Sequence, residues 1–298
     1  MTRILFTSDL HSNASLYAEL VECVREVRPQ IVLFGGDLFA GDPREQLRFA
    51  RGPFEESLAS LRDAGVQGVG LLPGNDDWNA PLHALHDSEH DILLHFVSER
   101  AWDVGRGVNI VGYGYTPLTP FSVKDFEKLD HYRPDKIEAL EANATGVATS
   151  ADDAVSPVRR ALDGSETIEK DLAALDREMR AGRTIFLSHC PPRNTQLDMA
   201  FGRHAGSQAL RAFLERTQPA ISLHGHVTQV EQRQGCFAEW LNDTLMVNPG
   251  QGSPLHAVFF EPENPTTTLE HSVLGAWCDA PTPASAAVES SSRRLPTD

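Results

Sequence analysis

Near its amino terminus the sequence reads Arg3-Ile4-Leu5-Phe6-Thr7-Ser8-Asp9-Leu10-His11. The first five residues are an apolar, β-prone run, which predicts a strand over residues 3–7. The polar group that follows leaves this strand at its carboxyl end, where open α/β sheets place their ligands. Asp9 and His11 are therefore expected at a cleft. An Asp-x-His pair also arises by chance as a turn before a helix N-cap, so the functional interpretation depends on whether the arrangement recurs.

It recurs twice in the next seventy residues. Residues 30–34 are apolar and lead into Gly35-Gly36-Asp37-Leu38, and residues 66–72 lead into Pro73-Gly74-Asn75-Asp76-Asp77. Helical patterns separate these runs: one is capped by Ser12 or Asn13, and one spans 44–64 with an expected break at Gly52-Pro53. Alternating strands and helices imply parallel pairing with right-handed crossovers. The three strand ends should therefore meet at one edge of a sheet.

Histidines take the corresponding positions in the second half of the chain. A strand over 183–187 precedes Ser188-His189-Cys190-Pro191-Pro192, and one over 219–223 precedes His224-Gly225-His226-Val227-Thr228. Further strands are predicted at 91–97, 107–113, 245–248, 256–261 and 268–274, and helices at 167–179 and 206–216. Residues 118–126 are predicted to be a loop entering a short helix. Residues 141–165 are polar and are expected to form a surface insertion or mobile loop.

Composition limits the class of protein. The chain has 298 residues, enough for one large core, and we expect one domain over 1–278 followed by a disordered tail over 279–298. A formal net charge of -16 argues against binding to a nucleic-acid backbone or an anionic membrane. The four cysteines show no Cys-x-x-Cys spacing, and no apolar run is long enough to span a membrane. These features predict a cytoplasmic protein of unknown oligomeric state.

The side chains at the predicted strand ends indicate a metal centre. Asp, Asn and His supply oxygen and imidazole ligands, a mixture that suits Mn, Fe, Zn or Ni ions. One carboxylate between two such ions can bridge them at about 3.5–4 Å, the separation used for hydrolytic phosphoryl chemistry. Asp37 is the candidate bridge.

The ordered motifs resemble the calcineurin-like metallophosphoesterases, whose pattern is Asp-x-His, Gly-Asp, Gly-Asn-His/Asp, a later His, and Gly-His-x-His. The resemblance runs from Asp9 to about Asn248. Ser188-His189-Cys190-Pro191-Pro192 and Leu223-His224-Gly225-His226 are also similar to the Icc-related predicted phosphoesterase branch. The family implies an α/β fold in which two packed mixed β-sheets are flanked by helices, a four-layer αββα sandwich.

Carried over by position, the resemblance implies two divalent or transition-metal ions. Asp9 and His11 would bind the first ion, and Asp37 would bridge. The second ion would take Asn75, His189 and His226.

The sequence departs from the family at the last ligand of the first ion. The family has a His two residues after the one in Gly-His, and here that position is Thr228. His224 is an alternative ligand, although its place before Gly225 favours a buried histidine beside the site. A water molecule or Thr228 itself could also complete the first ion.

A second departure concerns proton transfer. Asp76 stands where many family members have a His that protonates the leaving oxygen, and an Asp of ordinary pKa is a poor acid near neutral pH. His204 is the other candidate acid, or else a helix-start histidine with a local hydrogen bond. Arg193 could neutralise a phosphoryl oxygen or be a surface loop residue.

The resemblance implies metal-dependent hydrolysis of a small-molecule phosphodiester or phosphomonoester by a metal-bridging hydroxide. The alternatives are a catalytically weakened metal- or ligand-binding protein on the same fold, and a scaffold, which would leave the ordered motifs without a reason to coexist.

Overall fold

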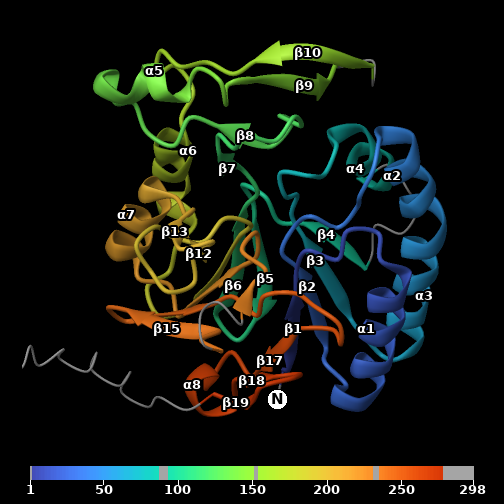
Figure 1. Cartoon of the computed structure of the whole chain (residues 1–298). Coiled ribbons are helices and arrows are strands. Elements are labelled where there is room, and N and C mark those ends of the chain that lie inside the picture. Colours follow the sequence, from blue (N-terminus) through green and yellow to red (C-terminus); the bar gives the residue numbers. More distant parts are fainter. Residues whose placement is uncertain (1, 87–92, 151–153, 231–234, 278–298) are drawn as a thin grey trace, which may run out of the picture.

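The structure is a computed structural model that describes residues 2–86, 93–150, 154–230 and 235–277. Two large β-sheets pack face to face, and helices cover the outer face of each (Figure 1). In Figure 1, α1 to α3 lie on the right, the sheets in the centre, and α6 and α7 on the left. This is the expected four-layer αββα arrangement, so the prediction of fold class is confirmed.

The first sheet has the order β19-β18-β17-β1-β2-β3-β4. Strands β1, β2, β3 and β4 run parallel to one another, and β17 pairs antiparallel with β1. The strands are β1 (Ile4–Thr7), β2 (Ile31–Phe34), β3 (Gly68–Leu71), β4 (Leu94–Phe96), β17 (Val258–Phe260), β18 (Glu270–His271) and β19 (Gly275–Ala276). Because β1, β2 and β3 are parallel and adjacent, the loops that follow them leave the sheet at one edge.

The second sheet has the order β15-β16-β14-β11-β6-β5. Its strands are β5 (Ala101–Gly105), β6 (Val108–Tyr113), β11 (Thr184–Ser188), β14 (Ile221–His224), β15 (Ala238–Leu241) and β16 (Thr244–Val247). Strands β11 and β14 pair in parallel, with Ser188 opposite His224. The two histidine-bearing loops are therefore neighbours. The edge strands β5 and β15 were not predicted from the sequence.

Along each of these strands, the side chains alternate between a central core, which lies between the two sheets, and an outer core, which lies under the helices. In β1, Ile4 and Phe6 enter the core between the sheets, whereas Leu5 packs against α1 and α3. In β11, Leu187 enters the same central core, whereas Phe186 packs against α6 and α7. Successive side chains of a strand point to opposite faces, and each of these residues is buried on its own face. This double burial explains why the strands read as continuous apolar runs.

Helix α1 (Ala14–Val27) follows the predicted pattern. The side chain of Asn13 accepts the backbone N–H groups of Ser15 and Leu16, which confirms Asn13 as the N-cap. Arg28 adopts a left-handed conformation that ends the helix before Pro29. The helix thereby places the Asp9 loop at its amino end.

The expected break at Gly52-Pro53 is confirmed. Helix α2 (Pro43–Phe49) passes into a π-helical turn (Ala50–Phe54) that contains Pro53, and α3 (Glu55–Asp63) continues from it. Proline has no N–H to donate, which favours such an irregular turn. The other helices are α4 (Asn79–His86), α5 (Ile137–Leu140), α6 (Ile168–Leu175), α7 (Gln208–Thr217) and α8 (Pro265–Thr268).

The loop predicted at 118–126 is present, but it does not enter a helix. This segment is irregular and lies between the short strands β7 (Thr116–Pro117) and β8 (Glu127–Lys128). The ammonium group of Lys124, fully buried, donates to Thr119 O at 2.8 Å and to Glu127 Oε2 at 2.7 Å. These contacts satisfy buried polar groups without helical hydrogen bonds.

The segment 141–165 was predicted to be a surface insertion or a mobile loop, and its described residues include regular structure in place of a loop. Strands β9 (Thr145–Thr149) and β10 (Val155–Arg159) form an antiparallel hairpin there, with mostly exposed or half-buried residues. β-Branched residues at 145, 147, 149, 155 and 158 favour strand over loop. The predicted tail at 279–298 lies outside the described residues. Within the described part of the chain, no helix has the length and apolar character needed to cross a bilayer.

Candidate functional site

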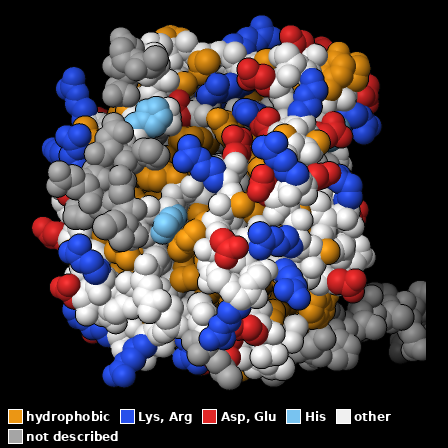
Figure 2. Space-filling view, turned by 180° about the vertical axis from the view of Figure 1, so that it is seen from behind, with side chains coloured by type: hydrophobic (Ala, Val, Ile, Leu, Met, Phe, Trp, Pro, Cys, Tyr) orange, Lys and Arg blue, Asp and Glu red, His pale blue; other side chains and the backbone are white. Residues whose placement is uncertain are grey.

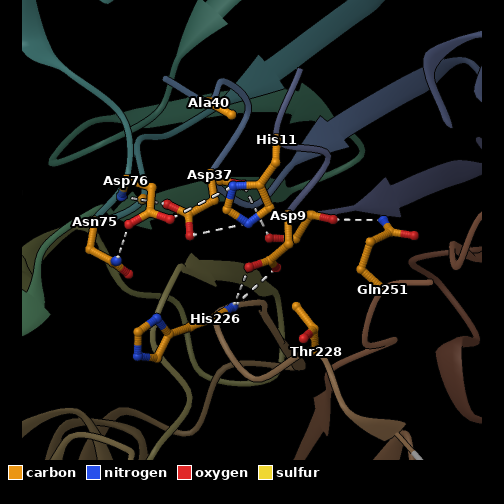
Figure 3. Close-up of polar contacts among 12 residues, drawn as sticks. Asp9, His11, Asp37, Ala40, Asn75, Asp76, His226, Thr228 and Gln251 are labelled. Atoms are coloured by element: carbon orange, nitrogen blue, oxygen red, sulfur yellow. Dashed lines mark hydrogen bonds and ion pairs between the residues drawn. The ribbon is translucent and has the colours of Figure 1, made fainter. Parts of the chain in front are cut away.

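Loops from both sheets converge on one cluster of polar side chains. Asp9 and His11 follow β1, Asp37 follows β2, His189 follows β11 and His226 follows β14. Ligand atoms of Asp9, His11 and Asp37 lie within 4.8 Å of one another, and so do those of Asp37, His189 and His226. Asp37 belongs to both groups. Figure 3 shows Asp9, His11 and Asp37 facing one another, and the backbone N–H of His226 donating to both carboxylate oxygens of Asp9.

His189 is oriented for metal binding. Its Nδ1 lies 2.7 Å from Gly35 O, a contact that places the ring proton on Nδ1 and leaves the Nε2 lone pair free. Nε2 is buried and lies 3.2 Å from Asp37 Oδ2, but it makes no well-aligned hydrogen bond with any described group. A buried ring nitrogen that has no described hydrogen-bond partner and lies beside a carboxylate fits the role of a metal ligand.

Asn75 and Asp76 bring the third loop to the cluster. The Asp76 backbone N–H donates to Asp37 Oδ1 at 2.8 Å, and Asn75 Nδ2 donates to Asp76 Oδ1 at 2.8 Å (Figure 3). Asn75 Oδ1 is buried and has no hydrogen-bond partner among the described residues. The amide oxygen that the family resemblance assigns to metal binding is therefore available.

The buried carboxylates of the cluster need nearby positive charge. Asp9 and Asp37 are almost fully buried. Burial raises the pKa of Asp9, and the charge of Asp37 raises it further. Burial also opposes ionisation of Asp37, but the neighbouring His189 holds the pKa of this carboxyl well below its usual range. In turn, although burial lowers the pKa of His189, Asp37 raises it to about 10. Without metal, a proton on His189 supplies the positive charge that the carboxylates require.

His11 and His226 differ electrostatically. His11 Nε2 lies 3.8 Å from Asp37 Oδ2 and its Nδ1 lies 3.8 Å from Asp76 Oδ2. Burial works against protonation of His11, but Asp37 and Asp9 raise its pKa overall. Burial, aided by the charge of His189, lowers the pKa of His226 to about 4, which keeps this imidazole neutral as a metal ligand requires.

The backbone at the cluster is strained. Asp9, His11, Asp37 and His226 all have positive φ angles, between 44° and 63°. Non-glycine residues adopt this conformation at a cost, and such residues concentrate at functional sites. The loops also pack closely: a Cβ on Gly225 would lie 2.5 Å from Asp9 Oδ2. This close approach explains the glycine before His226.

A neighbouring carboxylate, Asp77, holds two of the loops together. It is fully buried and accepts the backbone N–H groups of Leu38, Phe39 and Gly74 at 2.9–3.3 Å. Burial, reinforced by the charge of Asp37, raises the pKa of Asp77 to about 7. The sequence contains Asp77 next to Asp76 but gives no signal that distinguishes their roles.

Thr228 and His224 are the two candidates for the last ligand of the first ion. The backbone oxygen of Thr228 accepts from Gln251 N at 3.0 Å, and Gln251 Nε2 donates to Ser8 O at 2.7 Å (Figure 3). Thr228 is thus tied to the Asp9 loop. His224 is fully buried, with Nε2 2.9 Å from Ser222 Oγ and Nδ1 3.4 Å from Ser188 Oγ. Both of its ring nitrogens have hydroxyl neighbours, and it belongs to neither metal group.

His204 lies outside the cluster. It ends β13 (Arg203–His204), which pairs with β12 (Met199–Ala200), and its Nδ1 lies 2.7 Å from Asp198 Oδ1. No hydrogen bond or ion pair between described residues joins it to the metal groups. This contact with Asp198 is the kind of local hydrogen bond expected if His204 is a structural residue and not the catalytic acid. Arg193 Nη1 donates to His204 O at 3.0 Å, so this arginine is fixed to the same loop.

Comparison with known proteins agrees with this geometry. A family model described as calcineurin-like phosphoesterase matches residues 2–230, and the chain therefore belongs to that family. The structure is similar to a solved protein of Thermus thermophilus, with a TM-score of 0.54, 17% identity, and coverage of 91% of this chain and 97% of that one. A dimetal phosphatase from Danio rerio gives a TM-score of 0.52 at 13% identity, covering 87% and 92% respectively. The search of curated proteins found no match. The family resemblance is confirmed, whereas the Icc-related branch stays a prediction.

Proposed function

We propose that this protein hydrolyses a phosphodiester or phosphomonoester of a small molecule with two bound metal ions. The observation that carries the proposal is the shared carboxylate of Asp37, which belongs to both groups of candidate ligands. Asn75 Oδ1 and His189 Nε2 support it, since both atoms are buried, have no hydrogen-bond partner in the described part of the chain, and can donate a lone pair to a metal. Manganese is the ion we would test first, with Fe, Zn and Ni as the alternatives.

In this proposal Asp9 and His11 hold one ion, Asn75, His189 and His226 hold the other, and Asp37 serves both. Bound metals of this kind supply Lewis acidity and lower the pKa of water. Asp76 is the candidate acid for the leaving oxygen. Burial and the charge of Asp37 raise its pKa, and 43% of its side chain is exposed, so it can exchange protons with solvent.

The distribution of surface charge and the free cysteines support a small-molecule substrate and a cytoplasmic location. On the face seen in Figure 2, Lys and Arg side chains are interspersed with Asp and Glu among the described residues, rather than forming one basic patch. A nucleic-acid backbone would favour such a patch. Cys23 and Cys190 are free thiols, which fits a reducing compartment.

The test is hydrolysis of bis-p-nitrophenyl phosphate and p-nitrophenyl phosphate with added Mn²⁺, compared between the parent protein and Asp37→Asn. Metal-dependent turnover in the parent alone is the expected result. Metal binding without turnover of any phosphate ester would instead favour the alternative, a metal- or ligand-binding protein on this fold.

A further inference from the structure

A cavity of about 720 Å³ lies beside the candidate metal centre. The loop after β7, helix α5 and the β12–β13 hairpin form its walls, and in Figure 1 α5 and β8 lie above that hairpin. His226 also lines the cavity. Since His226 is grouped with Asp37 and His189, the cavity and the candidate metal centre share a wall.

The cavity walls are largely apolar. Leu118, Phe121, Leu129 and Leu140 line it. Phe121 is 54% exposed although it is a large apolar side chain. Pockets of about 300–1,000 Å³ accommodate drug-sized ligands, whereas a phosphate group needs neither this volume nor an apolar wall. The cavity therefore fits an organic group attached to the phosphate.

The charged residues of the cavity favour a negatively charged ligand. Arg133, Lys136 and Arg193 line it, and Asp130 is the one carboxylate among the described lining residues. Arg133 Nε lies 3.5 Å from Asp135 Oδ1, so the positive charge offered to a ligand comes from Lys136 and Arg193. The Asp130 carboxylate is already used by Gln208 N, which donates to it at 2.8 Å, and by Ser207 Oγ. The chain as a whole has a net charge of -16, so a positively charged cavity differs from the rest of its surface.

We propose that the substrate is an anionic phosphate ester of a large hydrocarbon group, which occupies this cavity while the phosphoryl group lies at the metal centre. This inference rests on the proposed function. His226 borders both the cavity and the candidate metal centre, and Lys136 and Arg193 give the cavity the positive charge that favours entry of an anionic ester. The proposal defines the substrate class by size and polarity: short or strongly polar esters would leave the apolar walls unfilled.

Calorimetric binding of alkylphosphonates, which are not hydrolysed, tests the proposal. Methylphosphonate and octylphosphonate carry the same head group, and each methylene that becomes buried contributes a factor of about 3–4 in affinity. With three or four methylenes buried, octylphosphonate should bind the Mn²⁺-supplemented protein at least about thirtyfold more tightly. Octyltrimethylammonium, which has the same chain and the opposite charge, should bind more weakly than octylphosphonate.

Substitutions in the cavity wall test whether the preference for octylphosphonate arises there. Phe121→Ser combined with Leu140→Ser should remove most of the preference for octylphosphonate and leave methylphosphonate affinity unchanged. Val273→Ser, at an exposed apolar residue that does not line the cavity, is the matched control. Equal binding of both phosphonates, or an octyl preference that survives the double variant with unchanged thermal unfolding, would overturn the proposal.

A hydrolysis series separates this proposal from the proposed function. Methyl and octyl p-nitrophenyl phosphates share a leaving group and therefore have similar intrinsic reactivity. Turnover without chain-length dependence would leave the phosphoesterase intact and reject the hydrocarbon pocket. An octyl preference in binding without turnover of any ester would reject the hydrolytic function and retain the pocket.

Discussion

His189 and Asp37 meet across the two sheets, with Nε2 of the histidine 3.2 Å from Oδ2 of the aspartate. Each residue comes from the end of a parallel strand, one in each sheet. The contact therefore depends on how the sheets pack against each other. It also places the shared carboxylate between candidate ligands contributed by both halves of the chain.

The first prediction concerns this shared carboxylate. Asp37→Asn should deplete both metal sites at once and reduce metal-dependent hydrolysis more than about a hundredfold, because loss of even an outer partner of a metal ligand costs about 10–100-fold. Metal content is measured by mass spectrometry of the purified protein. Asp63→Asn, at an exposed position of α3, is the control. Equal metal content in Asp37→Asn and Asp63→Asn would rule out the shared ligand.

The second prediction separates two adjacent aspartates. Asp77→Asn replaces an acceptor of three backbone N–H groups and brings an NH₂ group toward them. It should lower the free energy of unfolding by about 1–3 kcal/mol and weaken metal affinity about 10–100-fold.

Asp76→Asn is the matched comparison, since its carboxylate holds no described backbone N–H. It should lower turnover with little change in unfolding. Both variants are compared by denaturant titration and by Mn²⁺ dependence of activity. Similar unfolding curves for the two variants would show that Asp77 does not hold the loops together.

Sequence patterns could place the candidate ligands but not the residues that hold their loops in place. Asp9, Asp37 and His189 were located because a parallel sheet aligns strand ends, whatever the details of packing. Asp77 was not distinguished from Asp76, because only tertiary structure makes one fully buried and leaves the other partly exposed. The buried Lys124 was overlooked for a similar reason: a charged residue in a polar segment normally indicates a surface.

The third prediction concerns that buried lysine. Lys124→Met leaves the Glu127 carboxylate buried without its partner and should cost about 3–5 kcal/mol of folding free energy. Lys124→Met combined with Glu127→Met removes both charges and should cost much less. Urea unfolding of the single and double variants measures the difference.

The same pair gives a pH test with a definite sign. Burial already raises the pKa of Glu127 in the parent, and loss of the Lys124 ammonium raises it further. A raised carboxyl pKa in the folded state means that folding takes up a proton, so stability falls as pH increases. The deficit of Lys124→Met should therefore be smallest below the ordinary Glu pKa of about 4.3 and grow above it. A deficit that does not change with pH would exclude an unpaired Glu127 as its cause.

The last prediction concerns Thr228, where the sequence departs from the family. Gln251 ties the Thr228 backbone to the Asp9 loop, so a longer side chain at 228 starts from the side of the cluster that holds Asp9 and His11. Thr228→His should add an imidazole ligand to the first metal site, where the family's last histidine is replaced, tighten that site about tenfold or more, and raise activity when Mn²⁺ is limiting. Thr266→His, on the exposed surface of α8, controls for nonspecific metal binding by an added histidine. His224→Ala should leave metal content unchanged and lower only stability, because its ring nitrogens face Ser222 and Ser188. If His224→Ala empties one site while Thr228→His has no effect, then His224 is the ligand and the assignment of the first metal must be revised.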